Sequence, residues 1–307
     1  MRMTRGFPSR SEDRQPVVAS MGSFDGMHLG HQALVARVRE GARLGGLSSC
    51  IVTFFPHPLR VLAPERAPAM LQTLEDRLEV LERLGIDEAV VVPFTLELAA
   101  VQAGEFVRDM LLDRVRVAEL ISGPDARFGC GREGDVTLLK QIARSGAFEL
   151  HVVDPVCLDG ERISSSGLRR RVLAGDVEWA GRRLGRPYSM AGEVVKGDGR
   201  GTGLGFPTAN LCPEGELRPL DGVYACRAEL EDGSVWPAAV HVGPIPTFSI
   251  RRPTVEAHLI GFSGDLVGRR LRLHFVRRIR GTRVFDRAEA LQSRIAEDVR
   301  EAREVAG

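Results

Sequence analysis

The hydrophobic pattern of the chain changes near residue 186, and this change limits the available folds more than any other feature. Before it, apolar runs of strand length alternate with helix-length amphipathic segments, a pattern typical of a parallel sheet built from βαβ units. After it, short strand-like runs follow one another, broken by Gly, Pro and Asp, which favours a small antiparallel β-barrel. We therefore expect two domains, residues 1–186 and 187–307.

The first domain is predicted to be an α/β domain, Rossmann-like and doubly wound, with helices on both faces of its sheet. One helix follows the apolar stripe Leu74, Leu78 and Leu81, begins after Thr73 and ends near Gly85. The five strands are expected at residues 17–21, 50–55, 89–94, 118–122 and 148–153.

The second domain is predicted to be a small barrel with one helix on its outside. Residues 286–305 carry apolar side chains at three- and four-residue spacing, behind a predicted cap pair of Asp286 and Glu289. The first fifteen residues of the chain, by contrast, are polar and are expected to form a frayed tail.

Charge and cysteine usage exclude several classes of protein. The formal net charge is +1, from 42 basic and 41 acidic residues that are well mixed, so a sequence-blind nucleic-acid or membrane binder is not expected. No segment reaches the ~18 consecutive apolar residues of a membrane span. The five cysteines are scattered and form no C-x-x-C pair, so neither a disulfide framework nor a zinc site is expected, and a cytoplasmic location fits best.

The stretch GSFDGMHLGHQ follows the first apolar run and leads into the first helix. Glycines at such a turn leave backbone N–H groups free at the positive end of the helix dipole, where anions bind. His28 and His31 lie near the first turn and can share one face, so as donors they could stabilise negative charge on a triphosphate during transfer. Either histidine taken singly is more often an ordinary polar residue at a helix start.

A second glycine-rich stretch, GDGRGTGLG, lies in the predicted barrel at residues 197–205. Five glycines in nine residues allow the backbone to approach a phosphate closely. It is not a Walker A loop, because no G-K-[ST] follows. A glycine-rich turn in a β domain is usually only a turn, and what favours a site here is the segment FPTAN directly after it.

These motifs carry a resemblance to a known family. HLGH matches the H-x-G-H signature of the nucleotidylyltransferase superfamily, and G-x-F-D-G-x-H-x-G-H is similar to its flavin-adenylating branch. Further stretches agree in order along residues 17–305: FFPHPL, GPDARFGCGREGD, ISSSGLRRRV and GEVVKGDGRGTGLGFPTANL. As a whole, the chain resembles the bacterial bifunctional riboflavin kinase/FAD synthetases.

The resemblance implies that the first domain is an FMN adenylyltransferase, which transfers AMP from ATP to FMN and releases pyrophosphate. His28 and His31 would then be catalytic, and Asp125 would lie beside the flavin, although Ala126 stands where the family usually has Phe. From the residues alone, the serines of ISSSGLRRRV could equally form a helix N-cap. The resemblance assigns contacts with ATP or its phosphates to Gly22, Phe24, Asp25, Gly30, Ser164, Ser165 and Arg169.

The resemblance also implies that the second domain is a riboflavin kinase, which uses ATP to phosphorylate riboflavin to FMN. Thr208 and Asn210 would bind Mg²⁺ with the ATP phosphates, and both supply neutral oxygens suited to a hard cation. Glu256 would accept the proton of the ribityl 5′-hydroxyl, whereas by pattern alone it is a solvent-facing strand residue. Gly197, Gly201 and Gly205 are assigned to the phosphates, and Arg280 to the flavin.

Four positions depart from the kinase pattern of the family. His241 replaces a usual Asn, Ile245 an Arg, Gly261 an Asp and Val267 a Tyr. Three interpretations therefore stay open: a bifunctional enzyme, an FMN adenylyltransferase with a degenerate kinase domain or one of altered specificity, and a non-catalytic flavin-binding protein. The expected partners are the small molecules riboflavin, FMN and ATP.

Overall fold

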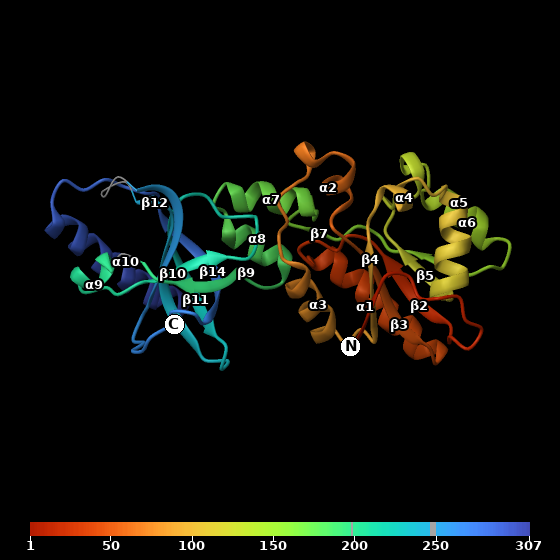
Figure 1. The fold of residues 1–307 in the computed structure, drawn as a ribbon, viewed down its shortest axis with the longest axis horizontal. Helices are drawn as coiled ribbons and strands as arrows, with labels where there is room; N and C mark the ends of the chain where they lie inside the picture. The colour runs from red at the N-terminus through yellow and green to blue at the C-terminus, as the bar shows by residue number, and fades with distance from the viewer. Residues whose placement is uncertain (198, 246–249) are drawn as a thin grey trace. The chain divides into compact units, whose positions relative to one another are not determined.

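The computed structural model describes residues 1–197, 199–245 and 250–307. The chain forms two compact units. The first comprises residues 1–68 and 74–164, and the second comprises residues 69–73 and 165–307. Figure 1 labels the helices and strands of both units.

The first unit is built on a six-stranded, fully parallel sheet with the strand order β1-β4-β3-β2-β5-β6. The five strands expected from the apolar runs are all present, which confirms the prediction of a parallel sheet. The strands are β1 (Arg2–Arg5), β2 (Val17–Met21), β3 (Ser48–Phe55), β4 (Glu88–Pro93), β5 (Val117–Ser122) and β6 (Glu149–Val152).

Strand β1 corrects the expectation of a frayed N-terminal tail. It pairs with β4 at one edge of the sheet. The carboxylate of Glu88 on β4 is buried and accepts hydrogen bonds from Arg2 and Arg14, both at 2.7 Å. Burial raises the pKa of Glu88, but the bonds from Arg2, Arg14 and Thr4 outweigh it and hold the pKa below its ordinary value. The polar residues of this segment are therefore partners of a buried carboxylate.

Helices cover both faces of the sheet, which confirms the doubly wound architecture (Figure 1). On one face, α1 (Leu29–Gly45) and α3 (Leu74–Arg83) pack against the strands through Val35, Val38, Val80 and Leu81. On the other face, the π-helical segment η2 (Phe106–Val115) and α6 (Val136–Ala143) form the second apolar layer. Shorter elements are α2 (Pro58–Leu62), η1 (Pro64–Arg66), α4 (Leu96–Ala99), α5 (Ala103–Glu105), η3 (Cys130–Arg132), β7 (Cys157–Leu158) and β8 (Glu161–Arg162).

The second unit contains a closed six-stranded antiparallel barrel, as predicted. Its interior is filled by alternate side chains of the strands, among them Tyr224 and Phe275, whose rings meet edge to face at 5.3 Å. The strands are β9 (Tyr188–Val195), β10 (Ala209–Pro213), β11 (Gly222–Leu230), β12 (Val235–Ile245), β13 (Ile250–Leu259) and β14 (Arg270–Arg280). They close in the order β10-β13-β12-β11-β14-β9.

Helix α10 (Ala288–Ala306) packs on the outside of this barrel, as predicted. Val299 and Ala302 lie against Ala225 of β11 and Ala239 of β12 in one apolar cluster. The predicted cap pair of Asp286 and Glu289 is wrong. The helix begins two residues after Asp286, so the N-cap is Arg287, which makes no side-chain cap bond.

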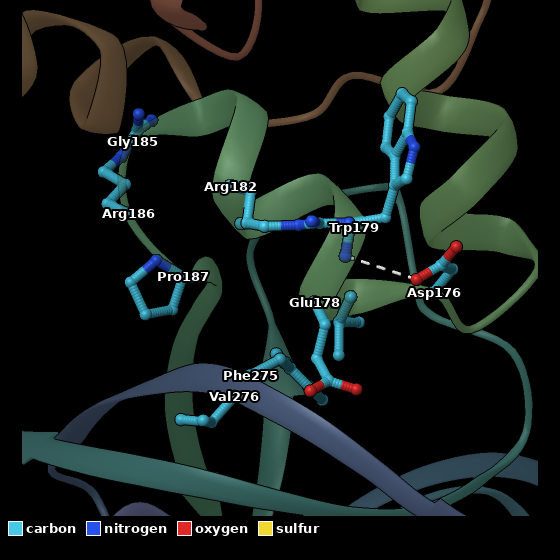
Figure 2. A pocket seen from close by; sticks show the side chains of 11 residues that line it. Asp176, Glu178, Trp179, Arg182, Gly185, Arg186, Pro187, Phe275 and Val276 are labelled. Atoms are coloured by element: carbon cyan, nitrogen blue, oxygen red, sulfur yellow. Dashed lines mark hydrogen bonds between the residues drawn. The ribbon is translucent and has the colours of Figure 1, made fainter. Parts of the chain in front are cut away.

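Three further helices belong to the second unit: α7 (Ser165–Leu173), α8 (Val177–Leu184) and α9 (Arg200–Gly203). A pocket of about 780 Å³ lies between α8 and the segment Phe275–Val276 of β14. Figure 2 shows the side chains that line it. Two of its charged lining residues form hydrogen bonds: Asp176 caps α8 by accepting from the Trp179 N–H, and Arg186 donates to the Leu184 carbonyl. None of the predicted site residues lines this pocket.

All five cysteines are free thiols. In the part of the chain that the structure describes, no helix combines the length and apolar character needed to span a membrane.

Candidate active sites

The first candidate site lies where β2 ends in the middle of the sheet. Strand β2 has β3 on one side and β5 on the other, so the strand order reverses direction at this point. In open α/β sheets, ligands bind outside the carboxyl ends of the strands at such a switch point. The loop of residues 22–28, which the sequence predicts to hold phosphates, joins β2 to α1 here (Figure 1).

This loop holds an unusual backbone conformation. Phe24 and Met27 have φ angles of 49° and 43°, and Gly26 between them has a φ of 85°. Positive φ at a residue with a side chain is strained, by on the order of 1–3 kcal/mol, and persists only where the surroundings enforce it. The side chains of Phe24 and Met27 are both buried in the core beneath the loop. Packing therefore fixes this turn.

His28 and His31 are brought together at the start of α1. His28 is the N-cap, and its Nδ1 accepts a hydrogen bond from the His31 backbone N–H at 3.2 Å. The two rings stack with their centroids 3.7 Å apart and their planes 15° from parallel. A Cβ atom at Gly30 would lie 3.1 Å from the His28 ring. The glycine of the H-x-G-H pattern thus leaves room for the first imidazole.

The surroundings of His31 keep its side chain neutral. Burial, with the charges of His28 and Arg77, holds the pKa of His31 well below its ordinary value. The Nδ1 atom is buried and has no hydrogen-bond partner among the described residues. A neutral imidazole offers one N–H donor and one acceptor, so His31 can donate to a ligand oxygen without carrying a charge.

Arg77 is a component of this site that sequence reasoning missed. It comes from α3 and is 1% exposed. Burial lowers the pKa of its guanidinium, while the carboxylates of Asp25 and Glu75 oppose that change. A signal was present in the sequence, because Arg77 lies three residues after Leu74 and four before Leu81, on the apolar stripe of its helix.

The other predicted residues of the loop are placed in different ways. The N–H of Gly22 donates to the Val52 carbonyl at 3.0 Å and so continues the pairing of β2 with β3. The ring of Phe24 meets that of His31 edge to face at 5.3 Å, and Asp25 is buried. Phe24 and Asp25 are therefore buried residues of this loop, and Phe24 packs against the His31 ring.

Asp125 follows β5, the strand beside β2, and therefore lies at the same edge of the sheet. It is exposed and forms an ion pair with Arg162 of β8. In the serine segment, Ser164 is the last residue of the first unit. Helix α7 begins at the next residue, Ser165, and it carries Arg169 in the second unit. The position of Ser165 and Arg169 relative to His31 stays a prediction.

The second candidate site lies on the glycine-rich loop that joins β9 to β10. A Cβ atom at Gly197 would lie 2.0 Å from the Asn210 Nδ2 atom, and one at Gly201 would lie 3.1 Å from the Thr208 hydroxyl oxygen. Only glycine allows the loop backbone to approach these side chains so closely. Gly205 ends the loop with a φ of 83°. The two predicted metal ligands thus lie against the loop predicted to bind phosphate.

The barrel register places Glu256 beside Asn210. Glu256 of β13 is paired with Asn210 of β10 on one side and with His241 of β12 on the other. Directly opposed residues of antiparallel strands project from the same face, with Cβ atoms about 5 Å apart. The flanking Val255 and Ala257 are buried, so the three polar side chains share the outer face of the barrel.

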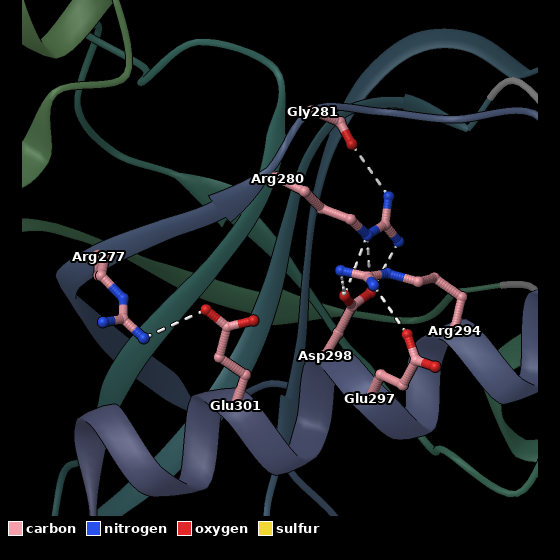
Figure 3. Close-up of polar contacts among 7 residues, drawn as sticks. All are labelled: Arg277, Arg280, Gly281, Arg294, Glu297, Asp298 and Glu301. Carbon is pink, nitrogen blue, oxygen red and sulfur yellow. Dashed lines mark hydrogen bonds and ion pairs between the residues drawn. The ribbon is translucent and has the colours of Figure 1, made fainter.

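Arg280 lies on β14, two strands beyond the strand of His241 in the order of the barrel. Val223 of β11 is paired with His241 on one side and with Arg280 of β14 on the other. The guanidinium of Arg280 contacts both carboxylate oxygens of Asp298 on α10 at 2.7–3.0 Å, as Figure 3 shows. Asp298 is 3% exposed and is also paired with Arg294 at 3.1 Å. The arginine predicted to contact flavin is therefore held by the terminal helix.

The four departures from the kinase pattern lie in different surroundings. Burial and the charge of Arg280 lower the pKa of His241, against the opposing carboxylate of Asp221. Gly261 and Val267 lie in the connection between β13 and β14, where Gly261 has a φ of 86° and Val267 is 54% exposed. The side chain of Ile245, and the following Pro246, Thr247 and Phe248, lie outside the described residues.

The chain matches two family models in succession. The model described as FAD synthetase matches residues 10–167, and the model described as riboflavin kinase matches residues 184–306. The first match contains the loop with His28 and His31, and the second contains the glycine-rich loop and Glu256. The order of the two matches agrees with the order of the two candidate sites.

Several proteins are similar over almost the whole chain. The bifunctional riboflavin kinase/FMN adenylyltransferase of Pseudomonas fluorescens is 38% identical, with 100% of this chain and 98% of the relative covered. The protein of that description from Escherichia coli K12 is 35% identical with the same coverage. A crystal structure described as a macrolide-efflux protein from Streptococcus pneumoniae is 27% identical, has a TM-score of 0.87 and covers 99% of both chains. The chain belongs to the bifunctional riboflavin kinase/FMN adenylyltransferase family.

Proposed function

We propose that this protein converts riboflavin to FMN in its C-terminal part and FMN to FAD in its N-terminal part, with ATP as the second substrate of both reactions. The observation that carries the proposal is that a chain matching both family models has two separate loops predicted to bind phosphate, each with its own polar side chains. The free cysteines support a reducing, cytoplasmic location as part of the proposal.

In the N-terminal reaction, a phosphate oxygen of FMN attacks the α-phosphorus of ATP. The bond from that phosphorus to the β-phosphate breaks, and pyrophosphate leaves. The attacking phosphate is already anionic, so no base has to remove a proton from it. His28, His31 and the start of α1 would bind the ATP phosphates and stabilise the charge that develops on them.

In the C-terminal reaction, the ribityl 5′-hydroxyl of riboflavin attacks the γ-phosphorus of ATP, and ADP leaves. The hydroxyl proton must be accepted, and Glu256 is the proposed acceptor. Thr208 and Asn210 would hold Mg²⁺, since both offer neutral oxygens and lie against Gly201 and Gly197 of the phosphate loop. When bound with ATP, Mg²⁺ would neutralise phosphate charge.

A second candidate function is FMN adenylylation alone, with a kinase part that is inactive or accepts a modified flavin. The observation that favours it is His241, which replaces the usual Asn and is paired in register with Glu256. A neutral imidazole beside the proposed base changes the shape of the site at the point where the hydroxyl must approach.

One experiment separates these functions. The protein is incubated with ATP and Mg²⁺ and either riboflavin or FMN, and the flavins are separated by chromatography. The proposed function requires FMN and FAD from riboflavin. FAD from supplied FMN, with riboflavin unchanged, supports the second candidate. Binding of flavin without any product would leave the non-catalytic interpretation.

The domain boundary near Arg186 is also a proposal, and fragments test it. Residues 1–186 should make FAD from FMN, and residues 187–307 should make FMN from riboflavin if the kinase is active. We expect the fragment 165–307 to melt at a higher temperature than 187–307, because α8 packs on β9 and β14 and its loss uncovers that surface. Folded fragments that work only when mixed would show that the sites are shared.

A further inference from the structure

Arg77 is a buried cation that neither proposed reaction uses. Its Nε atom is buried and has no hydrogen-bond partner among the described residues, although one of its Nη atoms is bonded. A buried charge with incomplete hydrogen bonding costs free energy, and an apolar side chain of similar volume is often at least as stabilising. Packing alone therefore does not account for an arginine at this position.

One arm of Arg77 is connected to the phosphate loop through Thr53 of β3. The Arg77 Nη1 atom donates to the Thr53 hydroxyl oxygen at 3.1 Å, and that hydroxyl lies 3.3 Å from the Ser23 carbonyl oxygen. A hydroxyl has a single proton. Because Arg77 can only donate, the Thr53 proton is left to point at Ser23. This fixes the peptide that directly precedes Phe24, the first strained residue of the loop.

The charge of Arg77 acts on the same loop. The buried carboxylate of Asp25 stabilises the charged form of Arg77, and Arg77 in turn disfavours protonation of His31. The charged groups that act on His31 are Arg77 from α3 and His28 from its own turn. Asp25 lies in the same loop, three residues before His28. Arg77 is therefore linked to the loop through the hydroxyl of Thr53, and its charge acts on His31.

We propose that Arg77 is a positioning residue of the N-terminal site: through Thr53 it holds the Ser23–Asp25 segment, and with it the His28–His31 pair, in the arrangement that binds the ATP phosphates. The proposal rests on the proposed adenylyl transfer. Arg77 itself is buried under the loop and does not take part in the chemistry.

The kinetic test uses the full-length protein with two changes at Thr53. Thr53→Val keeps the shape of the side chain but removes the hydroxyl, whereas Thr53→Ser retains the hydroxyl and serves as the matched control. We expect kcat/KM for ATP in FMN adenylylation to fall about tenfold in Thr53→Val, and by up to roughly 10²-fold in Arg77→Met, the scale of a small misplacement in a site. Thr53→Ser should stay within about twofold of the wild type.

A second measurement does not depend on activity. The His31 ring is titrated by nuclear magnetic resonance in the ligand-free protein. In the wild type it should stay neutral well below pH 6.5, since its pKa is lowered. In Arg77→Met the pKa should rise, because a positive charge that opposes protonation is gone. Burial persists, so the rise should be partial. Thr53→Val keeps the charge and should leave the titration in place.

These results separate the two proposals. Normal kinetics in Thr53→Val and Arg77→Met, with an unmoved His31 titration, would reduce Arg77 to a packing residue. If Arg77→Met does not fold, the Thr53→Val and Thr53→Ser pair decides the matter. A wild type that makes no FAD from FMN would refute the proposed function. The His31 titration would then still test the link between Arg77 and His31: a raised pKa in Arg77→Met supports it, and an unchanged pKa overturns it.

Discussion

Replacement of His31 by alanine is expected to lower kcat for FMN adenylylation by roughly 10²-fold or more, the scale of losing one donor that stabilises a transition state. The fold should persist, because the cap of α1 uses the backbone N–H of residue 31, which alanine retains. The measurement is the rate of FAD formation at saturating FMN and ATP, together with a thermal melt of the variant.

His151→Ala is the matched control for this variant. His151 lies on β6 of the same sheet, where its Nε2 atom is paired with Glu149 at 2.9 Å and Glu119 at 3.2 Å. It belongs to neither proposed site, so FAD formation should stay close to that of the wild type. A rate for His31→Ala within about twofold of the wild type would remove His31 from the mechanism.

Replacement of Glu256 by glutamine should abolish most riboflavin phosphorylation, with a loss of about 10²- to 10⁴-fold, because the amide cannot accept the hydroxyl proton. Glutamine has nearly the same shape, and the residue is only half-buried, so the barrel should stay folded. FMN adenylylation should not change. Both reactions are measured on one preparation, and the adenylylation rate reports the concentration of active protein.

Glu229→Gln provides the matched change elsewhere on the barrel. Glu229 is a strand residue of β11, and its carboxylate is paired with His274 of β14 at 2.7 Å. The loss of this partly exposed pair should have little effect on either reaction. If Glu256→Gln phosphorylates riboflavin as fast as Glu229→Gln, another group accepts the proton and the assignment fails.

Much of the fold follows from local hydrophobic patterns. Strand β5 begins at residue 117, one residue earlier than expected. Strand β6 covers residues 149–152 and is one residue shorter at each end than expected. An apolar run determines a buried strand of a parallel sheet almost by itself. Strand β1 could not be found in this way, because Arg2–Arg5 is polar. Its pairing partner β4 contributes Glu88, more than eighty residues along the chain.

The candidate sites were predictable in their motifs but not in their supporting residues. The pairing of Asn210, Glu256 and His241 depends on the register of three strands, which no local pattern specifies. Arg77 and Asp298 were missed for a common reason. Each occupies an apolar stripe position of its helix, Asp298 lying between Ile295 and Ala302, and such positions are normally assigned to core packing. A charged residue on an apolar stripe is the signal that could have found both.

The two six-stranded sheets of this protein differ in their exposure to aggregation. The barrel is closed, so its strands form a continuous ladder, whereas the open sheet ends in β1 and β6. An unpaired edge can template association with another chain unless it carries charge. The edge strands have the sequences RMTR and ELHV, which place the charged residues Arg2, Arg5 and Glu149 along them. Solubility of the N-terminal unit at high concentration therefore depends on these charges, and apolar substitutions there would favour edge-to-edge assembly without weakening either site.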